Sequence, residues 1–327
     1  MVGYVSRGAF SVTCSEVCVP NGASFRGEYF HMHLRSRAVE RERVYYLFMG
    51  GNESAPRVSV IIPSLDGYRD GCVPRLLASV ESQTFRDFEM HVVKGVSPQG
   101  RAINKGAALA RGEILLILDD DSRIADESVF QRLVDALDAD AMIGMAGASI
   151  VVPPEASAFQ RRASTQFPRF NTPVVERVTD SDLACHGCCA IPHRVFEEVG
   201  REREDIVRGL DPDLRVRLRD AGYRVVLVPN ARIYHPLPDG WRKLIRVFFR
   251  NGVGSAYAWK FQPESVYETH ESLDAAAFRP RTPWLFRVFR FPLRLMKALA
   301  QGRLMRFVAY CAYAVGYVWG LFTAKEL

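Results

Sequence analysis

Three consecutive carboxylates, Asp119, Asp120 and Asp121, follow residues 114–118, an apolar run with the composition of a buried strand. Adjacent carboxylates repel one another, and their burial is costly unless a cation lies between them. Mg²⁺ and Mn²⁺ prefer oxygen ligands and join one or two protein carboxylates to substrate phosphates. The cluster therefore predicts a divalent metal site in which Asp119 and Asp121 face one ion, and a solvated acidic turn is the alternative.

A second polar segment lies between residues 185 and 214, where Asp211 and Pro212 open a predicted helix. The free amides and the dipole of a helix N-terminus keep a capping carboxylate ionised. A fixed, ionised carboxylate can accept a proton, so Asp211 is a candidate general base. The alternative is that Asp211 only caps the helix and that Asp213 is only a favourable first-turn acid.

The number and spacing of the cysteines indicate whether the chain has a zinc site and which cellular compartment it occupies. Cys185, Cys188 and Cys189 stand beside His186 like half of a zinc site, but no second half follows, so buried structural thiols are expected. Seven cysteines without regular spacing indicate a reducing compartment and no disulfide framework. The first thirty residues lack the apolar stretch of a signal peptide, so the catalytic part is expected in the cytoplasm.

The elements that must position these residues alternate between strands and helices from residue 57 onward. This order predicts an α/β fold with a mostly parallel central sheet and flanking helices. Ligands of such sheets bind beyond the carboxyl ends of the strands, where Asp119 lies. Strands are predicted at 58–62, 90–93, 114–118, 142–152, 187–191 and 223–228, helices at 74–83, 102–110, 127–137, 192–199 and from 211, and a long irregular loop at 153–183.

Composition and pattern divide the chain into three parts. With 48% hydrophobic and 24% charged residues among 327, the chain has the composition of a globular protein. Residues 1–56 lack helical or strand periodicity and are predicted to be a poorly ordered extension, with Met49 as a possible true start. Residues 57–239 are predicted to form the catalytic domain, and residues 240–327 basic amphipathic and hydrophobic helices.

The order and spacing of these segments resemble the family 2 glycosyltransferases, which have the GT-A fold. The resemblance extends from residue 57 to about residue 236 and rests on several motifs in sequence. Residues 63–67 look like the family's opening nucleotide-binding loop, 101–112 like the helix before its metal motif, and 118–121 like its DxD motif. Further along the chain, residues 186–188 and 194–196 look like the family's acceptor-side strand and helix. Residues 209–214 look like its Glu-Asp-x-Asp-Leu segment, and residues 221–235 like the segment that closes its domain.

The resemblance implies transfer of a sugar from a nucleoside-diphosphate sugar to an acceptor hydroxyl, with inversion at the anomeric carbon. Asp121, assisted by Asp119, would hold Mg²⁺ or Mn²⁺ on the diphosphate, and His235 would face the same metal. Asp211 would be the general base. The positions expected to contact the nucleotide sugar are Pro63, Ser64, Asp66, Lys94, Arg101, Asn104, Asp119 and Asp120, and those expected on the acceptor side are His186, Gly187 and Asp213.

Two positions depart from the family pattern. Val93-Lys94-Gly95 stands where the family usually has an acidic pair for the nucleotide base, so Lys94 is expected to reach a phosphate or a differently charged donor. Leu210 replaces the acid that precedes the base. The alternatives are a catalytically silent scaffold or binding protein of the same fold, and another metal-dependent nucleotide-sugar transferase or nucleotidyltransferase, but Asp119, Asp121 and Asp211 together favour a glycosyltransferase.

Basic and large apolar residues alternate through residues 241–306, a pattern that suits an anionic membrane surface better than nucleic acid. Residues 240–261 predict an amphipathic helix, with core packing and a solvated basic face as the alternative. Residues 307–324 are uncharged and just long enough to span a membrane, although their Gly, Tyr and Trp content favours docking in the interface. We expect a protein on the cytoplasmic face, peripheral or anchored by this helix, with a lipid-linked or cell-surface glycan as acceptor.

Overall fold

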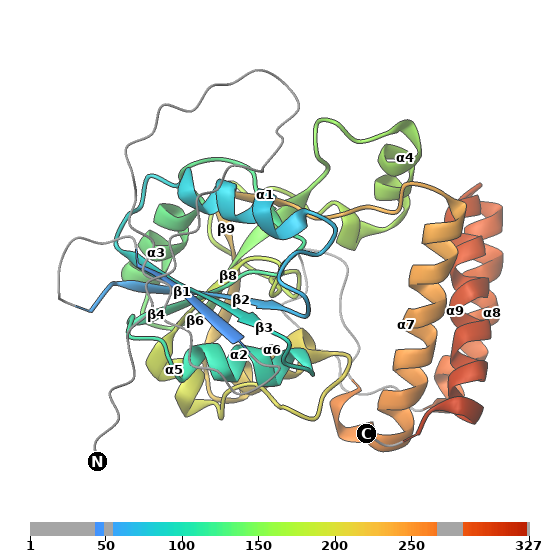
Figure 1. Ribbon diagram of the computed structural model, residues 1–327. Coiled ribbons are helices and arrows are strands. Elements are labelled where there is room, and N and C mark those ends of the chain that lie inside the picture. The colour runs from blue at the N-terminus through green and yellow to red at the C-terminus, as the bar shows by residue number, and fades with distance from the viewer. Residues whose placement is uncertain (1–42, 49–54, 267–283, 326–327) are drawn as a thin grey trace, which may run out of the picture. The chain divides into compact units, whose positions relative to one another are not determined.

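The computed structural model describes residues 43–48, 55–266 and 284–325 (Figure 1). All described residues belong to one compact unit. A nine-stranded mixed sheet forms the centre of this unit, in the order β1-β3-β2-β4-β8-β6-β9-β5, with β7 beside β9. Helices cover both faces of the sheet.

The predicted parallel strands form the centre of the sheet. β2 (Val58–Ser64) pairs in parallel with both β3 (Phe88–Lys94) and β4 (Ile114–Ile117). All residues of β2 and β4 are buried, which explains why their sequences are largely apolar, with Ser59 as the one polar residue within 58–62, rather than alternating. These strands end at one edge of the sheet, so the residues that follow them gather there.

One strand runs against this direction. β8 (Cys189–Pro192) is antiparallel to β4 on one side and to β6 (Ile143–Val151) on the other. β6 in turn pairs in parallel with β9 (Arg224–Tyr234), so β8 is an antiparallel insertion within an otherwise parallel core. Because β8 is reversed, its beginning lies beside the end of β4, and residues 185–188 come close to Asp119.

Helices on the two faces enclose two separate hydrophobic cores (Figure 1). α1 (Cys72–Glu81) and α3 (Val129–Ala139) cover one face, where Phe88 and Phe130 make an edge-to-face contact with ring centroids 5.6 Å apart. The opposite face packs against α2 (Gln99–Ala107), α5 (His193–Glu198) and α6 (Leu210–Asp220).

The structure differs from the predicted elements at three places. β1 (Arg43–Phe48) pairs antiparallel with β3 inside the segment predicted to lack structure, and a chain that began at Met49 would lack this strand. α4 (Ala158–Gln166) forms within the loop predicted at 153–183, where Ser157 and Gln160 make a capping box. The same segment contains η1 (Pro168–Phe170) and β7 (Thr179–Asp180), and β9 continues to Tyr234 because β5 (Arg123–Ile124) pairs with its end.

The C-terminal part is helical. It contains α7 (Trp241–Phe261), η2 (Pro263–Ser265), α8 (Trp284–Ala300) and α9 (Leu304–Thr323). α7 and α9 approach closely through glycine, since a Cβ added to Gly252 would come 2.1 Å from the carbonyl oxygen of Tyr313, and one added to Gly316 would come 2.1 Å from that of Phe249. Within the described residues, α9 is the one helix whose length and apolar composition would allow it to cross a membrane.

Candidate active site

The acid cluster lies in a turn directly beyond β4. The amide of Leu118 donates to the carbonyl of Ile61 at 3.0 Å and the amide of Asp119 to that of His186 at 2.9 Å, which continues the sheet pairing for two residues. The chain then turns, with the amide of Ser122 donating to the carbonyl of Asp119 at 3.0 Å. The turn places the predicted cluster at the edge where the central strands end.

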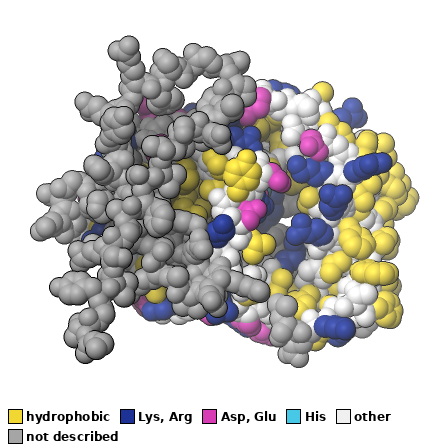
Figure 2. All heavy atoms as spheres, viewed as in Figure 1, with side chains coloured by type: hydrophobic (Ala, Val, Ile, Leu, Met, Phe, Trp, Pro, Cys, Tyr) yellow, Lys and Arg dark blue, Asp and Glu magenta, His cyan; other side chains and the backbone are white. Residues whose placement is uncertain are grey.

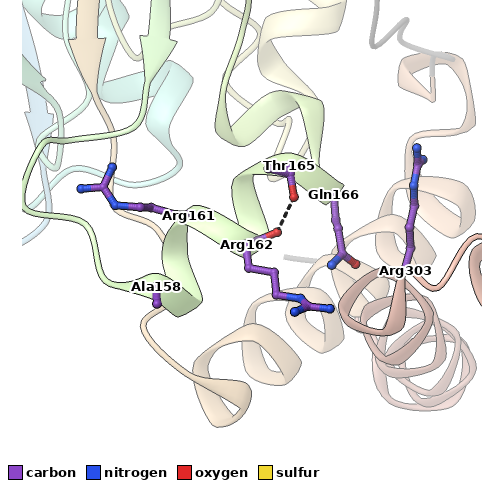
Figure 3. Close-up of a pocket in the computed structure, with 6 residues that line it drawn as sticks. All are labelled: Ala158, Arg161, Arg162, Thr165, Gln166 and Arg303. Atoms are coloured by element: carbon purple, nitrogen blue, oxygen red, sulfur yellow. Dashed lines mark hydrogen bonds between the residues drawn. The ribbon is translucent and has the colours of Figure 1, made fainter.

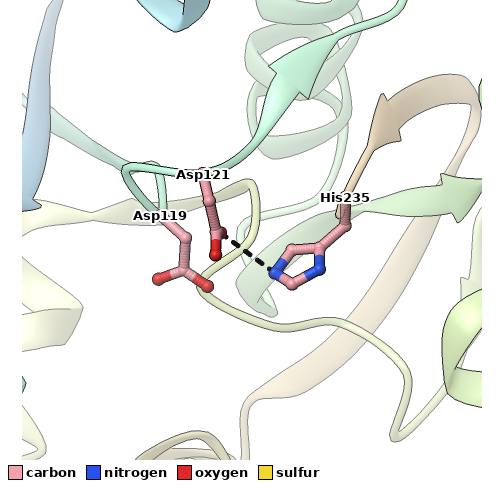
Figure 4. Close-up of side chains that lie close together, drawn as sticks. All are labelled: Asp119, Asp121 and His235. Atoms are coloured by element: carbon pink, nitrogen blue, oxygen red, sulfur yellow. Dashed lines mark ion pairs between the residues drawn. The ribbon is translucent and has the colours of Figure 1, made fainter. Parts of the chain in front are cut away.

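Asp119, Asp121 and His235 converge from two segments that are far apart in the sequence (Figure 4). Each offers one ligand atom, and these atoms lie within 4.8 Å of one another. His235 follows β9, and its Nε2 lies 3.1 Å from Oδ1 of Asp121. Two carboxylates and an imidazole form a donor set that suits Mn²⁺ or Mg²⁺, so the side chains fit the predicted metal.

Negative charge accumulates unevenly in this group. Burial, together with the charges of Asp121 and Asp211, raises the pKa of Asp119 to about 6. Burial also acts on Asp121, but the hydrogen bond and charge of His235 and the charge of Arg69 outweigh it, so the pKa of Asp121 is lowered. Asp121 therefore has cationic partners, whereas Asp119 lies next to two other carboxylates.

Arg69 and Asp120 connect the loop after β2 to the acid cluster. Arg69 Nη1 lies 2.8 Å from Oδ1 of the buried Asp120, and Nη2 forms an ion pair with Asp121. Arg69 has a φ of 44°, a left-handed conformation held by Asp66, whose Oδ1 accepts bonds at 2.8 Å from the amides of Tyr68 and Arg69. The sequence showed Arg69 only as an isolated base in a loop, so its contact with the acids became visible only in the fold.

Asp211 lies in the first turn of α6 and is held by His186. The prediction that Asp211 caps this helix is wrong, because Gly209, with a φ of 96°, is the N-cap and the helix already begins at Leu210. Oδ1 of Asp211 accepts a hydrogen bond from the His186 amide at 2.7 Å and lies 3.0 Å from Nδ1 of the same residue. Burial opposes ionisation of Asp211, but the charge and hydrogen bonds of His186 and the charge of Arg215 outweigh it, so its pKa lies below the usual range. Asp211 is an ionised carboxylate whose side chain is 34% exposed and can receive a proton.

Part of the site lies within a stretch of the chain that resembles a known family. Residues 97–200 match the family "Glycosyl transferase family 2", a range that contains the acid cluster and His186. This part of the chain is similar to the family 2 glycosyltransferases. The match leaves out the loop after β2, Asp211 and His235, so their assignment rests on their position in the fold.

A solved glycosyltransferase structure shares the fold of this chain. "Mannosyltransferase PcManGT from Pyrobaculum calidifontis in complex with GDP-Man and Mn2+" aligns with a TM-score of 0.52 and 15% identity, over 84% of this chain and 89% of that chain. "GalNAc-T7 with UDP, GalNAc and Mn2+" aligns with a TM-score of 0.43 and 16% identity, over 65% of this chain and 52% of that one. No curated protein matches the sequence.

Several residues predicted to contact the nucleotide sugar lie near the acid cluster. Ser64, the last residue of β2, bonds through its side chain to Asp120. Lys94 ends β3 directly opposite Ser64, and its side chain passes Gly67, where an added Cβ would lie 3.2 Å from Lys94 Cδ. Pro63 is buried within β2, and Arg101 is exposed on α2. The loop after β2 and the end of β3 therefore form one side of the site.

Two residues predicted to contact the donor or the acceptor have side chains that form hydrogen bonds within the protein. Nδ2 of Asn104 donates to the carbonyl of Glu202 at 2.8 Å, and Oδ1 accepts from the Glu202 amide at 2.9 Å, so Asn104 joins α2 to the chain before α6. Asp213 is buried and accepts a hydrogen bond from Arg217 Nε at 2.8 Å. The i, i+4 spacing of Asp213 and Arg217 on a helix could have indicated this pairing from the sequence.

The Cys-His segment is a structural part of the site. Burial raises the pKa of the Cys185 thiol to about 11 and those of Cys188 and Cys189 above their usual values, so these thiols stay protonated. Gly187 lies in the narrow space between them and β9, since an added Cβ would be 3.1 Å from Ile233 Cδ1 and 3.3 Å from Cys185 Sγ. In the described parts of the chain, the cysteines belong to no cluster with metal-ligand geometry.

Two residues near the cluster escaped sequence reasoning. Gln99, at the first turn of α2, donates from Nε2 to Oδ1 of Asp119 at 2.7 Å. Glu202, in an irregular segment, places Oε1 2.8 Å from Nε2 of His186. Gln99 belongs to no periodic pattern or charged motif, and Glu202 lies within a run of charged residues, 201–205, in which no signal distinguishes it from its neighbours.

Proposed function

We propose that the domain is an inverting glycosyltransferase that moves a sugar from a nucleoside-diphosphate sugar to an acceptor hydroxyl. The observation that carries this proposal is the convergence of Asp119, Asp121 and His235 within 4.8 Å at the edge of the sheet. The family match of residues 97–200 supports a transferase, and residues 57–239 would be its catalytic part. The GT-A neighbour that holds GDP-Man and Mn²⁺ supports a nucleotide sugar as donor.

The metal ligands would be Asp119, Asp121 and His235. A bound Mg²⁺ or Mn²⁺ would supply Lewis-acid stabilisation to the diphosphate leaving group. Arg69 contacts Asp120 and Asp121, and it would stay close enough to the cluster to contribute positive charge beside the diphosphate. Lys94 and Arg101 would add positive charge on the side of the nucleotide, in place of the acidic pair usual in the family.

Asp211 would remove the proton of the acceptor hydroxyl. Its bonds from His186 fix one carboxylate oxygen, Oδ1, and this leaves Oδ2 as the candidate acceptor of the proton. For inversion the hydroxyl must attack from the face of the sugar opposite the leaving diphosphate. Asp211 belongs to α6 and the metal group to the ends of β4 and β9, so the base and the leaving group would be held by different elements.

The acceptor side would be formed by the segment around His186 and Gly187 together with the start of α6. We propose a membrane-held acceptor, such as a lipid-linked glycan, because residues 240–327 would place the domain at the cytoplasmic face of a membrane. α9 and α8 expose large apolar side chains, among them Phe289 at 72% and Phe322 at 84%. Such residues are favourable in contact with acyl chains.

The arrangement of the C-terminal helices fits docking in the membrane interface better than a membrane-spanning α9. α9 lies along α7 from the hydrophobic cluster that Leu244 and Met305 share to the hydrogen bond of Lys260 Nζ with the carbonyl of Ala324 at 3.1 Å. α7 carries five basic residues and no acidic one. A spanning α9 would take these charges into the bilayer, at a cost of roughly 2.5–3.5 kcal/mol for each near the centre.

Calorimetric binding of UDP, GDP and dTDP, each with and without Mn²⁺, tests the proposal. One nucleotide should bind to the wild type only with metal, and Asp121→Asn should abolish this binding. Asp135→Asn is the matched control, because this exposed carboxylate bonds only within α3, to Gln131. If no nucleotide binds under any condition, the domain is a catalytically silent scaffold and the proposal fails.

A further inference from the structure

A pocket of about 660 Å³ lies between α4 and the start of α9, away from the acid cluster (Figure 3). It is lined by Ala158, Arg161, Arg162, Thr165, Gln166 and Arg303. Three of these residues are arginines and none is acidic. The lining therefore favours an anionic ligand that can take several guanidinium hydrogen bonds, such as a phosphate group.

The pocket is held in shape by buried contacts beneath it. Ala163 and Phe167 of the α4 segment form one hydrophobic cluster with Leu244 of α7 and with Met305 and Ala309 of α9. Gln166, only 7% exposed, accepts a hydrogen bond from the amide of Arg306 at 3.1 Å, which ties the first turn of α9 to α4. Arg161 and Arg162 on α4 and Arg303 immediately before α9 are thus held at positions fixed by packing, and Arg161 Nη2 also donates to the carbonyl of Pro154 at 2.5 Å.

The segments that line the pocket carry more positive than negative charge. Residues 156–175 contain three arginines and no Asp or Glu, and residues 284–325 contain no Asp or Glu either. Acidic residues flank the first of these segments, Glu155 and Glu176, and Glu155 forms an ion pair with Arg123 at 2.5 Å. Figure 2 shows Lys and Arg side chains gathered beside the hydrophobic side chains of the C-terminal helices. An anion that approaches this face would meet a predominantly positive surface.

The pocket adjoins an apolar surface. Leu304, the residue after Arg303, is 54% exposed and begins the uncharged helix α9. On α8, Leu293 and Met296 are 67% and 64% exposed. A membrane in contact with these residues would bring its headgroup layer to the level of Arg303, because basic residues beside an apolar segment lie at that boundary.

We propose that this pocket binds the phosphate of an anionic phospholipid headgroup while the exposed faces of α8 and α9 lie in the acyl region. The pocket would then set the height and rotation of the catalytic domain on the membrane. A free phosphate or a nucleic acid would use the arginines but would leave the adjoining apolar surface in water, so a lipid is the ligand that satisfies both. This inference deepens the proposed membrane setting and does not depend on glycosyl transfer.

Flotation with lipid vesicles tests the pocket. The full chain is mixed with vesicles of phosphatidylcholine alone or of phosphatidylcholine with phosphatidylglycerol. The wild type should bind the vesicles that contain phosphatidylglycerol more tightly than the neutral ones. The triple variant Arg161→Gln, Arg162→Gln, Arg303→Gln should lose roughly a hundredfold in affinity for the anionic vesicles, since each basic residue near such a surface contributes about 1 kcal/mol. Its affinity for neutral vesicles should stay unchanged.

A charge-matched control separates the pocket from general electrostatics. Arg75→Gln, Arg86→Gln, Arg194→Gln removes three exposed arginines from α1, the loop after it and α5, and it should keep the preference for anionic vesicles. An equal loss in both triple variants, or no lipid preference in the wild type, overturns the proposal. Release by inorganic phosphate at constant ionic strength would show a free-phosphate site instead and also overturn it. Nucleotide binding of the same samples reports folding and shows separately whether the proposed transferase site is intact.

Discussion

Nδ1 of His186 lies 3.0 Å from Oδ1 of Asp211, and the amide of the same histidine donates to that oxygen at 2.7 Å. On its other side, Nε2 of His186 lies 2.8 Å from Oε1 of the fully buried Glu202. Burial opposes charge on the imidazole, but the two carboxylates outweigh it and hold the pKa of His186 well above its usual value. A protonated His186 therefore joins the candidate base to the chain segment that precedes α6.

His186→Ala should destabilise the domain, because it removes the nearer of two cationic partners from the buried Glu202 and leaves only Arg217, whose Nη2 lies 3.9 Å from Oε2. Loss of one partner of a buried ion pair costs about 3–5 kcal/mol. Urea denaturation measures the change. Glu202→Gln added to His186→Ala should restore part of the lost stability, and a double variant no more stable than His186→Ala would contradict this account.

Asp211→Asn should reduce turnover and leave binding of the nucleoside diphosphate unchanged. Loss of a general base costs roughly 10²–10⁴-fold in kcat. Release of nucleoside diphosphate in the presence of acceptor gives the rate, and calorimetry gives the affinity. Equal losses of kcat and of nucleotide affinity would show that Asp211 belongs to the donor site instead.

Asn104→Ala should lower stability without weakening nucleotide binding. The substitution leaves the amide and carbonyl of Glu202 without their side-chain partner, and each unsatisfied buried group costs about 1–3 kcal/mol. Thermal unfolding and nucleotide calorimetry on the same sample separate the two effects. The position would belong to the nucleotide site, as the sequence predicts, if affinity fell while the melting temperature stayed constant.

Gly316→Val should separate α9 from α7, since even a Cβ at this position would come 2.1 Å from the carbonyl oxygen of Phe249. Backbone on the opposing helix cannot move aside as a flexible side chain could, so the helices must shift apart. Proteolysis in detergent should then cut the C-terminal region faster than in the wild type. Gly240→Ala is the control, because an added Cβ there meets no atom within 4 Å, and it should leave the cleavage rate unchanged.

Asp140→Asn should lower stability at neutral pH and have little effect in acid. The bond from the Met142 amide and the contact with Arg224 at 2.7 Å lower the pKa of Asp140. Because the pKa of Asp140 is lower in the folded than in the unfolded state, its ionised carboxylate stabilises the fold above the unfolded-state pKa of about 4. This stabilisation disappears as the pH falls through the folded-state pKa. Urea midpoints of the variant and the wild type should converge below about pH 4, and a constant difference would contradict the electrostatic origin.

The sequence predicted the strands that are buried on both faces. Residues 114–118 are a continuous apolar run, and residues 58–62 are apolar except for Ser59, because helices cover both sides of β2 and β4. Such runs can be recognised from the local sequence without long-range information. Local sequence patterns failed to predict the elements that depend on strand pairing or on a short capping motif. β1 exists through its pairing with β3, and α4 depends on a capping box within a polar segment of low helical periodicity.

By itself, the sequence determined the α/β order, the acid cluster at a strand end and Asp211 at a helix start, because each depends on neighbours within a few residues. Only the tertiary structure decided which distant groups complete the site. The antiparallel β8 brings His186 to Asp119, the extended β9 brings His235 to Asp121, and the loop after β2 brings Arg69 to the same carboxylate. The side chain of Asn104, which the sequence predicts in the nucleotide site, bonds to Glu202 instead. Glu202 lies far along the chain, so no local pattern indicates this contact.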